Sequence, residues 1–218
     1  SDKLKIAVIG TGRMGSVHAK NIVRHIPEAN LVAVCDIRLE VAQSIAEELG
    51  ITYVVKDYRD LLVDADIEAV LIAASTYAHD YIIIDAAAAG KHIFCEKPLA
   101  VDLQKIDHAI QATQNAVVKL QVGFNRRFDK SFQKVHEIVT SGDIGHPCIL
   151  HIISRDPEVP AMEFMKTSGG MFMDMTIHDF DMARYQMGDV DEVYASGNVL
   201  IEPELKEFDD IDTSLVTL

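Results

Sequence analysis

Hydrophobic residues in the first half of the chain alternate between short continuous runs and helix-like periodic stretches. The runs predict buried strands, at residues 4–9, 31–35, 51–55, 69–74, 92–95 and 117–122. The periodic stretches predict the intervening helices, from Gly15 to His25 and at 39–49, 58–62, 77–89 and 103–114. Strands that alternate with helices in this way are typical of βαβ units. We therefore predict an α/β fold whose N-terminal part is a doubly wound parallel sheet of the Rossmann type.

The pattern changes near residue 123, where we place a boundary between domains 1–122 and 123–218. The second part predicts helices and strands of a different kind, namely helices at 132–140 and 170–187 and strands at 148–153, 192–201 and 210–218. These elements predict an α+β second domain. Residues 213–218 alternate like a half-buried strand with no turn or cap after them, so we expect a chain truncated at Leu218.

Composition and charge exclude several classes of protein. The 218 residues are 49% hydrophobic, which excludes disorder, and 20 Lys and Arg stand against 34 Asp and Glu. A net charge of −14 argues against a nucleic-acid partner, which would need clustered basic residues. No apolar run approaches the roughly 20 residues of a membrane span, and no secretory signal is visible, so we expect no membrane partner and a cytoplasmic location. We expect Cys35, Cys95 and Cys148 to be buried thiols.

A glycine-rich motif, Gly-Thr-Gly-Arg-Met-Gly at residues 10–15, lies between the first predicted strand and helix. Gly10 permits a tight turn, Gly12 lets the backbone approach a pyrophosphate and Gly15 allows close helix packing, while Arg13 and Met14 open the helix whose N-H groups face the phosphates. Asp36 closes the second strand, where a carboxylate accepts hydrogen bonds from an adenosine ribose and repels a 2′-phosphate. The motif therefore predicts NAD as the cofactor. Arg38 either pairs with the 2′-phosphate of NADP or is a solvated charge.

Two later strand ends carry further candidates, because ligands of such folds bind at the carboxyl ends of the strands. Glu96 and Lys97 follow one strand, and Lys97 either points into the crevice or is an exposed lysine paired with Glu96. Ser75, Thr76 and His79 follow another strand. His79 either reaches the cofactor or only occupies the first turn of a helix. The other histidines, His18 among them, stand in no such pattern.

The predicted helix at 170–187 carries a pair suited to proton transfer. Asp174 and His178 are spaced i, i+4 and so share one helix face, about one turn apart. A neutral histidine can take a hydroxyl proton, and a neighbouring carboxylate can orient its ring. A surface salt bridge is the alternative. No third ligand stands at a telling spacing, so we predict no metal, and we expect Asp179 and Asp181 to be capping or solvated acids.

Four stretches together, at residues 10–15, 90–99, 123–128 and 168–185, resemble the glucose-fructose oxidoreductase/inositol dehydrogenase family. The resemblance covers essentially the whole chain, and residues 168–184 are most similar to its inositol 2-dehydrogenase branch. It implies a Rossmann domain followed by a substrate domain with an open-faced sheet, through which members associate as homodimers or homotetramers. It also implies a small-molecule polyol substrate.

The resemblance further implies roles for individual residues. Lys97, Asp174 and His178 would form the catalytic set, brought together across the interdomain cleft. His178 would take a proton from a ring hydroxyl as hydride leaves for the nicotinamide, Asp174 would orient His178, and Lys97 would stabilise the reacting oxygen. Asn125 and Arg126 match the motif that lines the polyol pocket. Some inositol dehydrogenases carry Met in place of Asn125 and a substrate-binding His in place of Ser154, so the choice of polyol stays open.

Three functions follow from these observations. The first is an NAD-dependent inositol 2-dehydrogenase, which converts myo-inositol to its 2-keto product. A related sugar or deoxysugar dehydrogenase is the alternative within the same fold. A nucleotide-binding regulator without catalysis is the third, and we expect such a protein to lose part of the set Lys97, Asp174 and His178, all of which are present.

Overall fold

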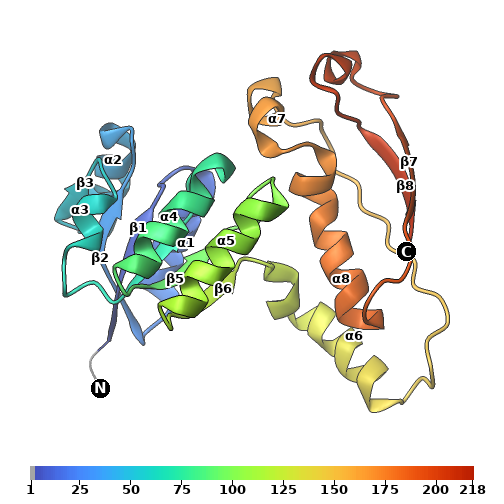
Figure 1. Ribbon diagram of the computed structural model, residues 1–218, viewed down its shortest axis with the longest axis horizontal. Helices are drawn as coiled ribbons and strands as arrows, with labels where there is room; N and C mark the ends of the chain where they lie inside the picture. The colour runs from blue at the N-terminus through green and yellow to red at the C-terminus, as the bar shows by residue number, and fades with distance from the viewer. Residues whose placement is uncertain (1–2) are drawn as a thin grey trace. The chain divides into compact units, whose positions relative to one another are not determined.

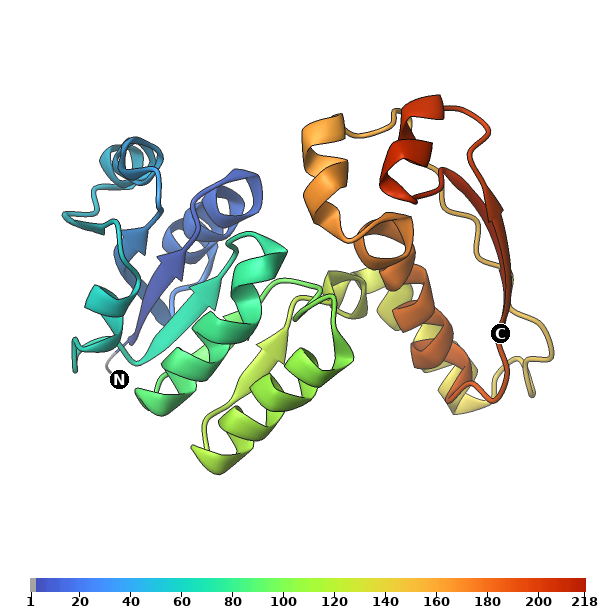
Figure 2. The same cartoon turned by 45° about the horizontal axis from the view of Figure 1, so that its top comes forward.

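The computed structural model describes residues 3–218, which form two compact units that divide between Gly123 and Phe124. Each unit has its own secondary structure, and Figures 1 and 2 show the helices and strands of both from two directions.

The first unit is built on one sheet of six parallel strands. Its strands are β1 (Leu4–Ile9), β2 (Ala29–Cys35), β3 (Tyr53–Val55), β4 (Ala69–Ile72), β5 (His92–Cys95) and β6 (Leu120–Val122). They lie in the order β3-β2-β1-β4-β5-β6, and every neighbouring pair is parallel. This is the strand order of the dinucleotide-binding doubly wound fold, in which the order reverses between β1 and β4. The predicted fold is confirmed.

Helices of the first unit follow the predicted segments closely. They are α1 (Arg13–His25), α2 (Leu39–Leu49), α3 (Arg59–Leu62), α4 (Thr76–Ala88) and α5 (Leu103–Asn115). Local chemistry sets their ends. Gly50 ends α2 in the left-handed region with φ +72°, and the Asp102 carboxylate accepts a hydrogen bond from the Lys105 N-H at the start of α5.

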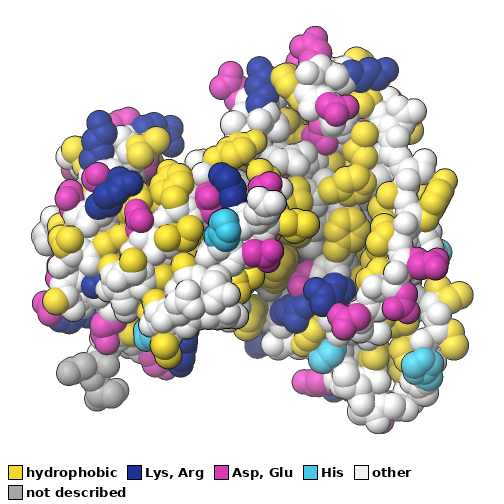
Figure 3. Space-filling view, viewed as in Figure 1, with side chains coloured by type: hydrophobic (Ala, Val, Ile, Leu, Met, Phe, Trp, Pro, Cys, Tyr) yellow, Lys and Arg dark blue, Asp and Glu magenta, His cyan; other side chains and the backbone are white. Residues whose placement is uncertain are grey.

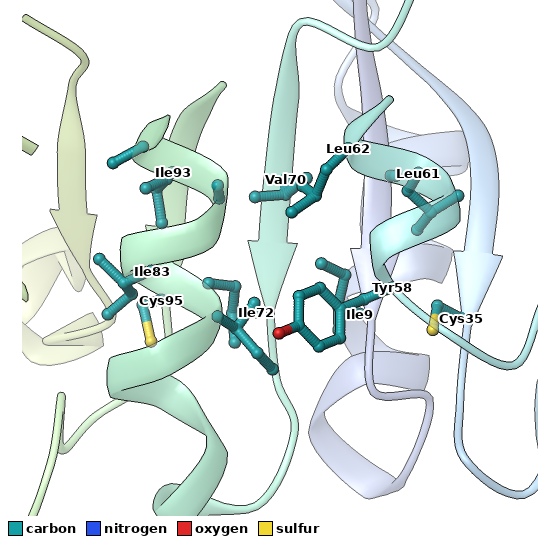
Figure 4. Close-up of a cluster of buried hydrophobic side chains, with 14 of the residues drawn as sticks. Ile9, Cys35, Tyr58, Leu61, Leu62, Val70, Ile72, Ile83, Ile93 and Cys95 are labelled. Atoms are coloured by element: carbon teal, nitrogen blue, oxygen red, sulfur yellow. The ribbon is translucent and has the colours of Figure 1, made fainter. Parts of the chain in front are cut away.

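Alternate residues of β1, β3, β4 and β5 contribute to two separate hydrophobic clusters, one on each face of the sheet. In β1, Ala7 and Ile9 join the cluster that holds α3, α4 and α5, whereas Val8 joins the cluster that holds α1 and α2. Figure 4 shows the first of these clusters, with Ile9, Cys35, Ile72 and Cys95 packed from the strands. Because strand side chains alternate between faces, the continuous apolar runs in the sequence mark strands that are covered on both sides.

The second unit combines helices with a two-stranded antiparallel sheet. Its elements are the short helix η1 (Asn125–Phe128), α6 (Lys130–Ser141), α7 (Met162–Ser168), η2 (Phe172–Thr176), α8 (Ile177–Met187), β7 (Tyr194–Asn198), η3 (Pro203–Phe208) and β8 (Thr213–Thr217). Helix α6 and the β7 and β8 strands confirm the elements predicted there, and both strands are shorter than expected.

Residues 148–153 are not a strand, which corrects one prediction. No described residue pairs with this segment, and its apolar side chains are largely exposed, Ile149 at 83% and Ile153 at 76%. An apolar run marks a strand only where a partner supplies backbone hydrogen bonds and a covering face. Cys148 is exposed for the same reason, so its predicted burial is wrong, whereas Cys35 and Cys95 are buried as expected. Helix α7 was not predicted.

The predicted helix over 170–187 is present but not uniform. Residues 172–176 form a wider π-helical turn, η2, and α8 continues from Ile177 to Met187. Asp174 lies within that turn. Single π-helical turns inside α-helices are frequent at functional sites.

Candidate active site

The candidate residues of the first unit lie at one edge of its sheet. Gly10 follows β1, Asp36 follows β2, Ser75 and Thr76 open the helix after β4, and Glu96 and Lys97 follow β5. Parallel strands end at the same edge, so the topology brings together residues that are far apart in sequence. The edge includes the point between β1 and β4 where the strand order reverses.

Two of the three motif glycines are required by close packing. Gly10 has φ +87°, and a Cβ there would lie 2.5 Å from the Ala74 backbone nitrogen. A Cβ on Gly15 would lie 1.8 Å from the Gly10 carbonyl oxygen. Gly12 differs, since a Cβ there would meet nothing within 4 Å. The space beside Gly12 is therefore open, as it must be for a phosphate to approach the backbone.

Helix α1 begins directly after this loop. Gly12 is its N-cap and supplies no side chain to the first N-H groups, and Arg13 and Met14 form its exposed first turn. The Ser16 hydroxyl donates to the Thr11 carbonyl at 2.7 Å, which fixes the loop against the helix. A helix start without a side-chain cap leaves N-H groups and partial positive charge available for an anion.

Asp36 is buried and hydrogen-bonded to the glycine loop. Its Oδ2 accepts from the Thr11 N-H at 2.8 Å and from the Thr11 hydroxyl at 3.1 Å, and its Oδ1 accepts from the Arg38 N-H at 3.0 Å. The Arg38 side chain is 64% exposed, with Nε 4.0 Å from Asp36 Oδ1. Asp36 thus holds the loop in shape and presents its carboxylate at the end of β2.

Glu96 links helix α1 to the lysine at the end of β5. Its Oε1 lies 2.6 Å from His18 Nε2, and its Oε2 accepts from the Lys97 N-H at 3.3 Å. Burial works to raise the pKa of Glu96, but His18 and the N-H of Lys97 outweigh it, and the pKa is lowered. Glu96 is therefore a carboxylate at neutral pH. A Cβ on Gly123 would lie 2.9 Å from its Oε2, so a larger residue there would displace the Glu96 carboxylate.

His79 lies in the first turns of α4 and is buried, with 1% of its surface exposed. Its Nδ1 lies 2.8 Å from the Pro98 carbonyl oxygen and its Nε2 lies 3.0 Å from that of Ala74. Both ring nitrogens are thus engaged by the protein backbone. Ser75 is the N-cap of the same helix and is exposed, and Thr76 is its first residue.

The candidates of the second unit lie on two short stretches. Asp174 is in η2 and His178 is in the first turn of α8, both partly exposed, while Asn125 and Arg126 begin η1. Asn125 is exposed.

Asp179 and Asp181 are ion-paired acids, not capping or solvated ones as predicted. Asp179 Oδ1 accepts from the Arg126 guanidinium and, at 2.7 Å, from the Ser154 hydroxyl. Asp181 accepts a bidentate pair from Arg127 at 2.7 to 2.9 Å. The hydrogen bond from Arg127 to Asp181 raises the pKa of the guanidinium. These pairs form because η1 packs against α8, a contact that no local pattern reveals.

Sequence reasoning missed three partners at these sites: His18 for Glu96, Thr11 for Asp36 and Asp179 for Arg126. The pairs are separated by 78, 25 and 53 residues. Only the pair of Thr11 and Asp36 could have been predicted, since the strand order of the expected fold places the glycine loop beside the end of β2.

Comparison with known proteins identifies the family. Residues 4–124 match the model described as an oxidoreductase family with an NAD-binding Rossmann fold, and residues 132–218 match the GFO/IDH/MocA C-terminal domain. The chain belongs to the GFO/IDH/MocA oxidoreductase family. The resemblance seen in the sequence motifs is confirmed.

Individual relatives are similar over nearly the whole chain. The uncharacterized oxidoreductase YrbE of Bacillus subtilis is 50% identical over 97% of this chain and 62% of its own length. Myo-inositol 2-dehydrogenase of Thermotoga maritima is 46% identical over 99% of this chain and 64% of its own length. A solved structure of scyllo-inositol dehydrogenase from Lactobacillus casei, with bound NAD(H) and scyllo-inositol, has a TM-score of 0.87 and 35% identity over 99% of this chain and 65% of that one. The chain thus spans less than two thirds of the length of these relatives.

The residues at the sheet edge fit the NAD named by the family description. The open space at Gly12, the uncapped start of α1 and the carboxylate of Asp36 are the three features that a pyrophosphate and an adenosine ribose require. Among residues 3–218, no helix is both long and apolar enough to cross a membrane.

Proposed function

We propose that the chain is part of an NAD-dependent dehydrogenase that oxidises a ring hydroxyl of a cyclitol, converting myo-inositol to its 2-keto product. The observation that carries the proposal is the sheet edge, where the glycine loop, Asp36 and Lys97 stand together at strand ends, in a chain 46% identical to a myo-inositol 2-dehydrogenase. The alternative is oxidation of a related sugar or deoxysugar.

We assign the cofactor to the first unit. The N-H groups at the start of α1, from Gly12 to Gly15, would hold the pyrophosphate, and Asp36 the adenosine ribose. Arg38, Ser75, Thr76 and Glu96 belong to the same edge. His79 either reaches the cofactor or only occupies the first turn of α4; both of its ring nitrogens lie at backbone carbonyls, so we assign it no direct contact with the cofactor. When bound, NAD supplies the acceptor for the hydride that leaves the substrate carbon.

The proton chemistry falls to three residues. His178 takes the proton of the reacting hydroxyl while the C–H hydrogen leaves as hydride, so the carbon becomes a ketone. Asp174, in the π-helical turn before α8, orients the imidazole and favours its protonated form. Lys97 donates a hydrogen bond to the reacting oxygen and stabilises the negative charge that develops on it.

Asn125 and Arg126 are assigned to polyol binding. An arginine has five N-H donors, so the guanidinium keeps donors for a hydroxyl while it is paired with Asp179. This pairing also holds the side chain in one orientation.

Formation of NADH tests the proposal, with a His178→Ala variant as the comparison. We expect turnover with an inositol and NAD, and its loss in the variant at unchanged NAD affinity. Because the chain spans 64% of the Thermotoga maritima relative, the assay is run on the 218-residue chain and on the same chain completed by the part of that relative beyond the match. NAD binding without turnover on any cyclitol or sugar would favour the regulator, and unchanged turnover in the variant would remove His178 from its role.

We further propose that the protein works in the cytoplasm as a homodimer or homotetramer associated through the second unit. Figure 3 shows hydrophobic side chains on the surface of this unit, and Ile149, Tyr194 and Leu215 are each at least 70% exposed. Apolar surface of this kind is typical of association sites. The free thiols of Cys35, Cys95 and Cys148 are in keeping with a reducing compartment. Light scattering and cell fractionation test the two statements.

A further inference from the structure

His79 occupies an unusual position for a buried histidine. It belongs to α4, yet its ring contacts the backbone of two turns that each follow a different strand, at Ala74 after β4 and at Pro98 after β5. Carbonyl oxygens can only accept hydrogen bonds, so each contact is a hydrogen bond only when the ring nitrogen that makes it carries a proton. A ring protonated on one nitrogen donates a hydrogen bond to one carbonyl at a time, and a ring protonated on both nitrogens donates to both carbonyls.

The turn at Ala74 lies directly against the glycine loop. A Cβ on Gly10 would lie 2.5 to 2.6 Å from the backbone atoms of Ala73 and Ala74, and the Ala73 N-H donates to the Ile9 carbonyl at 2.8 Å. A shift of Ala74 toward Gly10 would therefore also move the glycine loop, because close-packed protein interiors leave no free space between them.

The turn at Pro98 follows Lys97 immediately. The Glu96 N-H donates to the Ile72 carbonyl at 2.9 Å, which fixes the start of this turn to β4. The contact from His79 Nδ1 to the Pro98 carbonyl fixes its far side. Lys97 is thus held between two hydrogen-bonded points, and one of them is His79.

We infer that His79 is a positioning residue that sets the glycine loop and Lys97 relative to each other, through Ala74 on one side and Pro98 on the other. This inference rests on the proposed function, since it gives Lys97 and the loop their roles. His79 touches neither cofactor nor substrate in this account. It acts through two backbone segments, one beside the glycine loop and one directly after Lys97.

The two contacts can be separated by substitution. In H79N, the amide nitrogen takes the place of Nδ1 and can still donate to Pro98, whereas in H79Q it takes the place of Nε2 and can still donate to Ala74. Loss of one buried hydrogen bond corresponds to about a tenfold change in an equilibrium or rate constant. We expect H79N to weaken NAD binding about tenfold with kcat within about twofold of the unsubstituted protein. For H79Q we expect the reverse, a kcat about tenfold lower at nearly unchanged NAD affinity.

His108→Asn is the matched control, because His108 is exposed on α5, and it should leave both quantities unchanged. H79L should lose both. A merely structural role would lower the thermal stability of H79N and H79Q without splitting the two readouts, so equal effects of H79N and H79Q overturn the inference, as does an H79L that behaves like the unsubstituted protein.

Failure of the proposed function gives a different result. If the unsubstituted protein binds NAD but turns over no cyclitol or sugar, the proposed activity fails, and the NAD affinities of H79N and H79Q still decide the inference. Weaker binding in H79N than in H79Q supports it, and equal binding refutes it.

Discussion

Asp36 illustrates at the residue scale how one carboxylate can hold a loop and still keep an acceptor position for the proposed cofactor. It accepts three hydrogen bonds from the protein, two of them from Thr11. A carboxylate offers about four acceptor positions, so about one remains for a ribose hydroxyl. The sequence assigns Asp36 to an adenosine ribose from its place after the second strand, and this assignment stays a prediction. The bonds of Asp36 to the loop could not be predicted, because they depend on how the two strand ends pack.

Substitution of Asp36 should therefore change the choice between NAD and NADP. A matched substitution at Thr11 should show whether this change comes from the Asp36 charge or from the shape of the loop. Asp36→Asn removes the charge that repels a 2′-phosphate, so we expect the ratio of NAD to NADP affinity to fall at least about tenfold. Thr11→Val removes only the hydroxyl bond to Oδ2 and should cost about 1 kcal/mol of stability with the ratio unchanged. Titration of both nucleotides measures the ratio. A Thr11→Val protein that loses its preference as Asp36→Asn does would assign the preference to loop shape instead.

At the scale of elements, prediction succeeded where a segment's own residues decide its structure. Helix α2 was predicted residue for residue because an amphipathic pattern ends at Gly50, which adopts the left-handed conformation. The prediction of a strand at residues 148–153 was wrong because a strand depends on a partner outside the segment. The π-helical turn at 172–176 and the ion pairs of α8 also depend on packing, so periodicity alone could not reveal them.

Two of the three glycines of the loop, Gly12 and Gly15, should respond differently to alanine. Gly15→Ala places a methyl group on the Gly10 carbonyl, so we expect it to lose more than about 2 kcal/mol of stability. Gly12→Ala meets no atom within 4 Å and should stay within about 1 kcal/mol, while NAD binding is lost because the methyl group fills the space for the phosphates. Thermal unfolding and NAD titration separate the two effects. Tight NAD binding by Gly12→Ala would place the pyrophosphate elsewhere.

The turn between β7 and η3 should respond to acid. Asp212 accepts hydrogen bonds from the N-H groups of Leu200, Ile201 and Glu202. Burial alone would raise the pKa of Asp212, but these bonds lower this pKa to about 2. A lowered pKa means that Asp212 stabilises the turn above about pH 4, and that this contribution is lost as the pH falls toward 2.

The amide NMR shifts of residues 200–202 measure this effect. They should titrate with a midpoint near pH 2, and Asp212→Asn should abolish the titration. Asp209→Asn is the control, because Asp209 lies with Asp212 between η3 and β8, and it should leave the midpoint of the titration unchanged. A midpoint near 4 in the unsubstituted protein would show that the three N-H bonds do not stabilise the carboxylate.

At the scale of the whole molecule, the two units carry different parts of the proposed function. Both hydrophobic clusters of the parallel sheet, and every residue assigned to NAD, lie before Phe124. The change of pattern near residue 123 led us to expect two domains, 1–122 and 123–218. The residues assigned to proton transfer are shared between the units, and the chain spans less than two thirds of its relatives, so turnover is the property that depends most on the complete protein.

A fragment of residues 1–123 should therefore fold and bind NAD by itself. We expect one cooperative unfolding transition, because the fragment keeps both clusters, and an NAD affinity within about threefold of the 218-residue chain. Calorimetry and titration measure these. A fragment that folds but does not bind NAD would show that the second unit contributes to the cofactor site.

The central claim is oxidation of a cyclitol with NAD, and the most direct measurement is NADH formation with myo-inositol, scyllo-inositol and glucose, each with NAD and with NADP. It is made on the 218-residue chain and on the chain completed from its relative. We predict turnover with an inositol, faster with NAD than with NADP, in at least the completed chain. Turnover with glucose alone would move the substrate to the sugars, and silence with all three in both proteins, with NAD bound, would contradict the account.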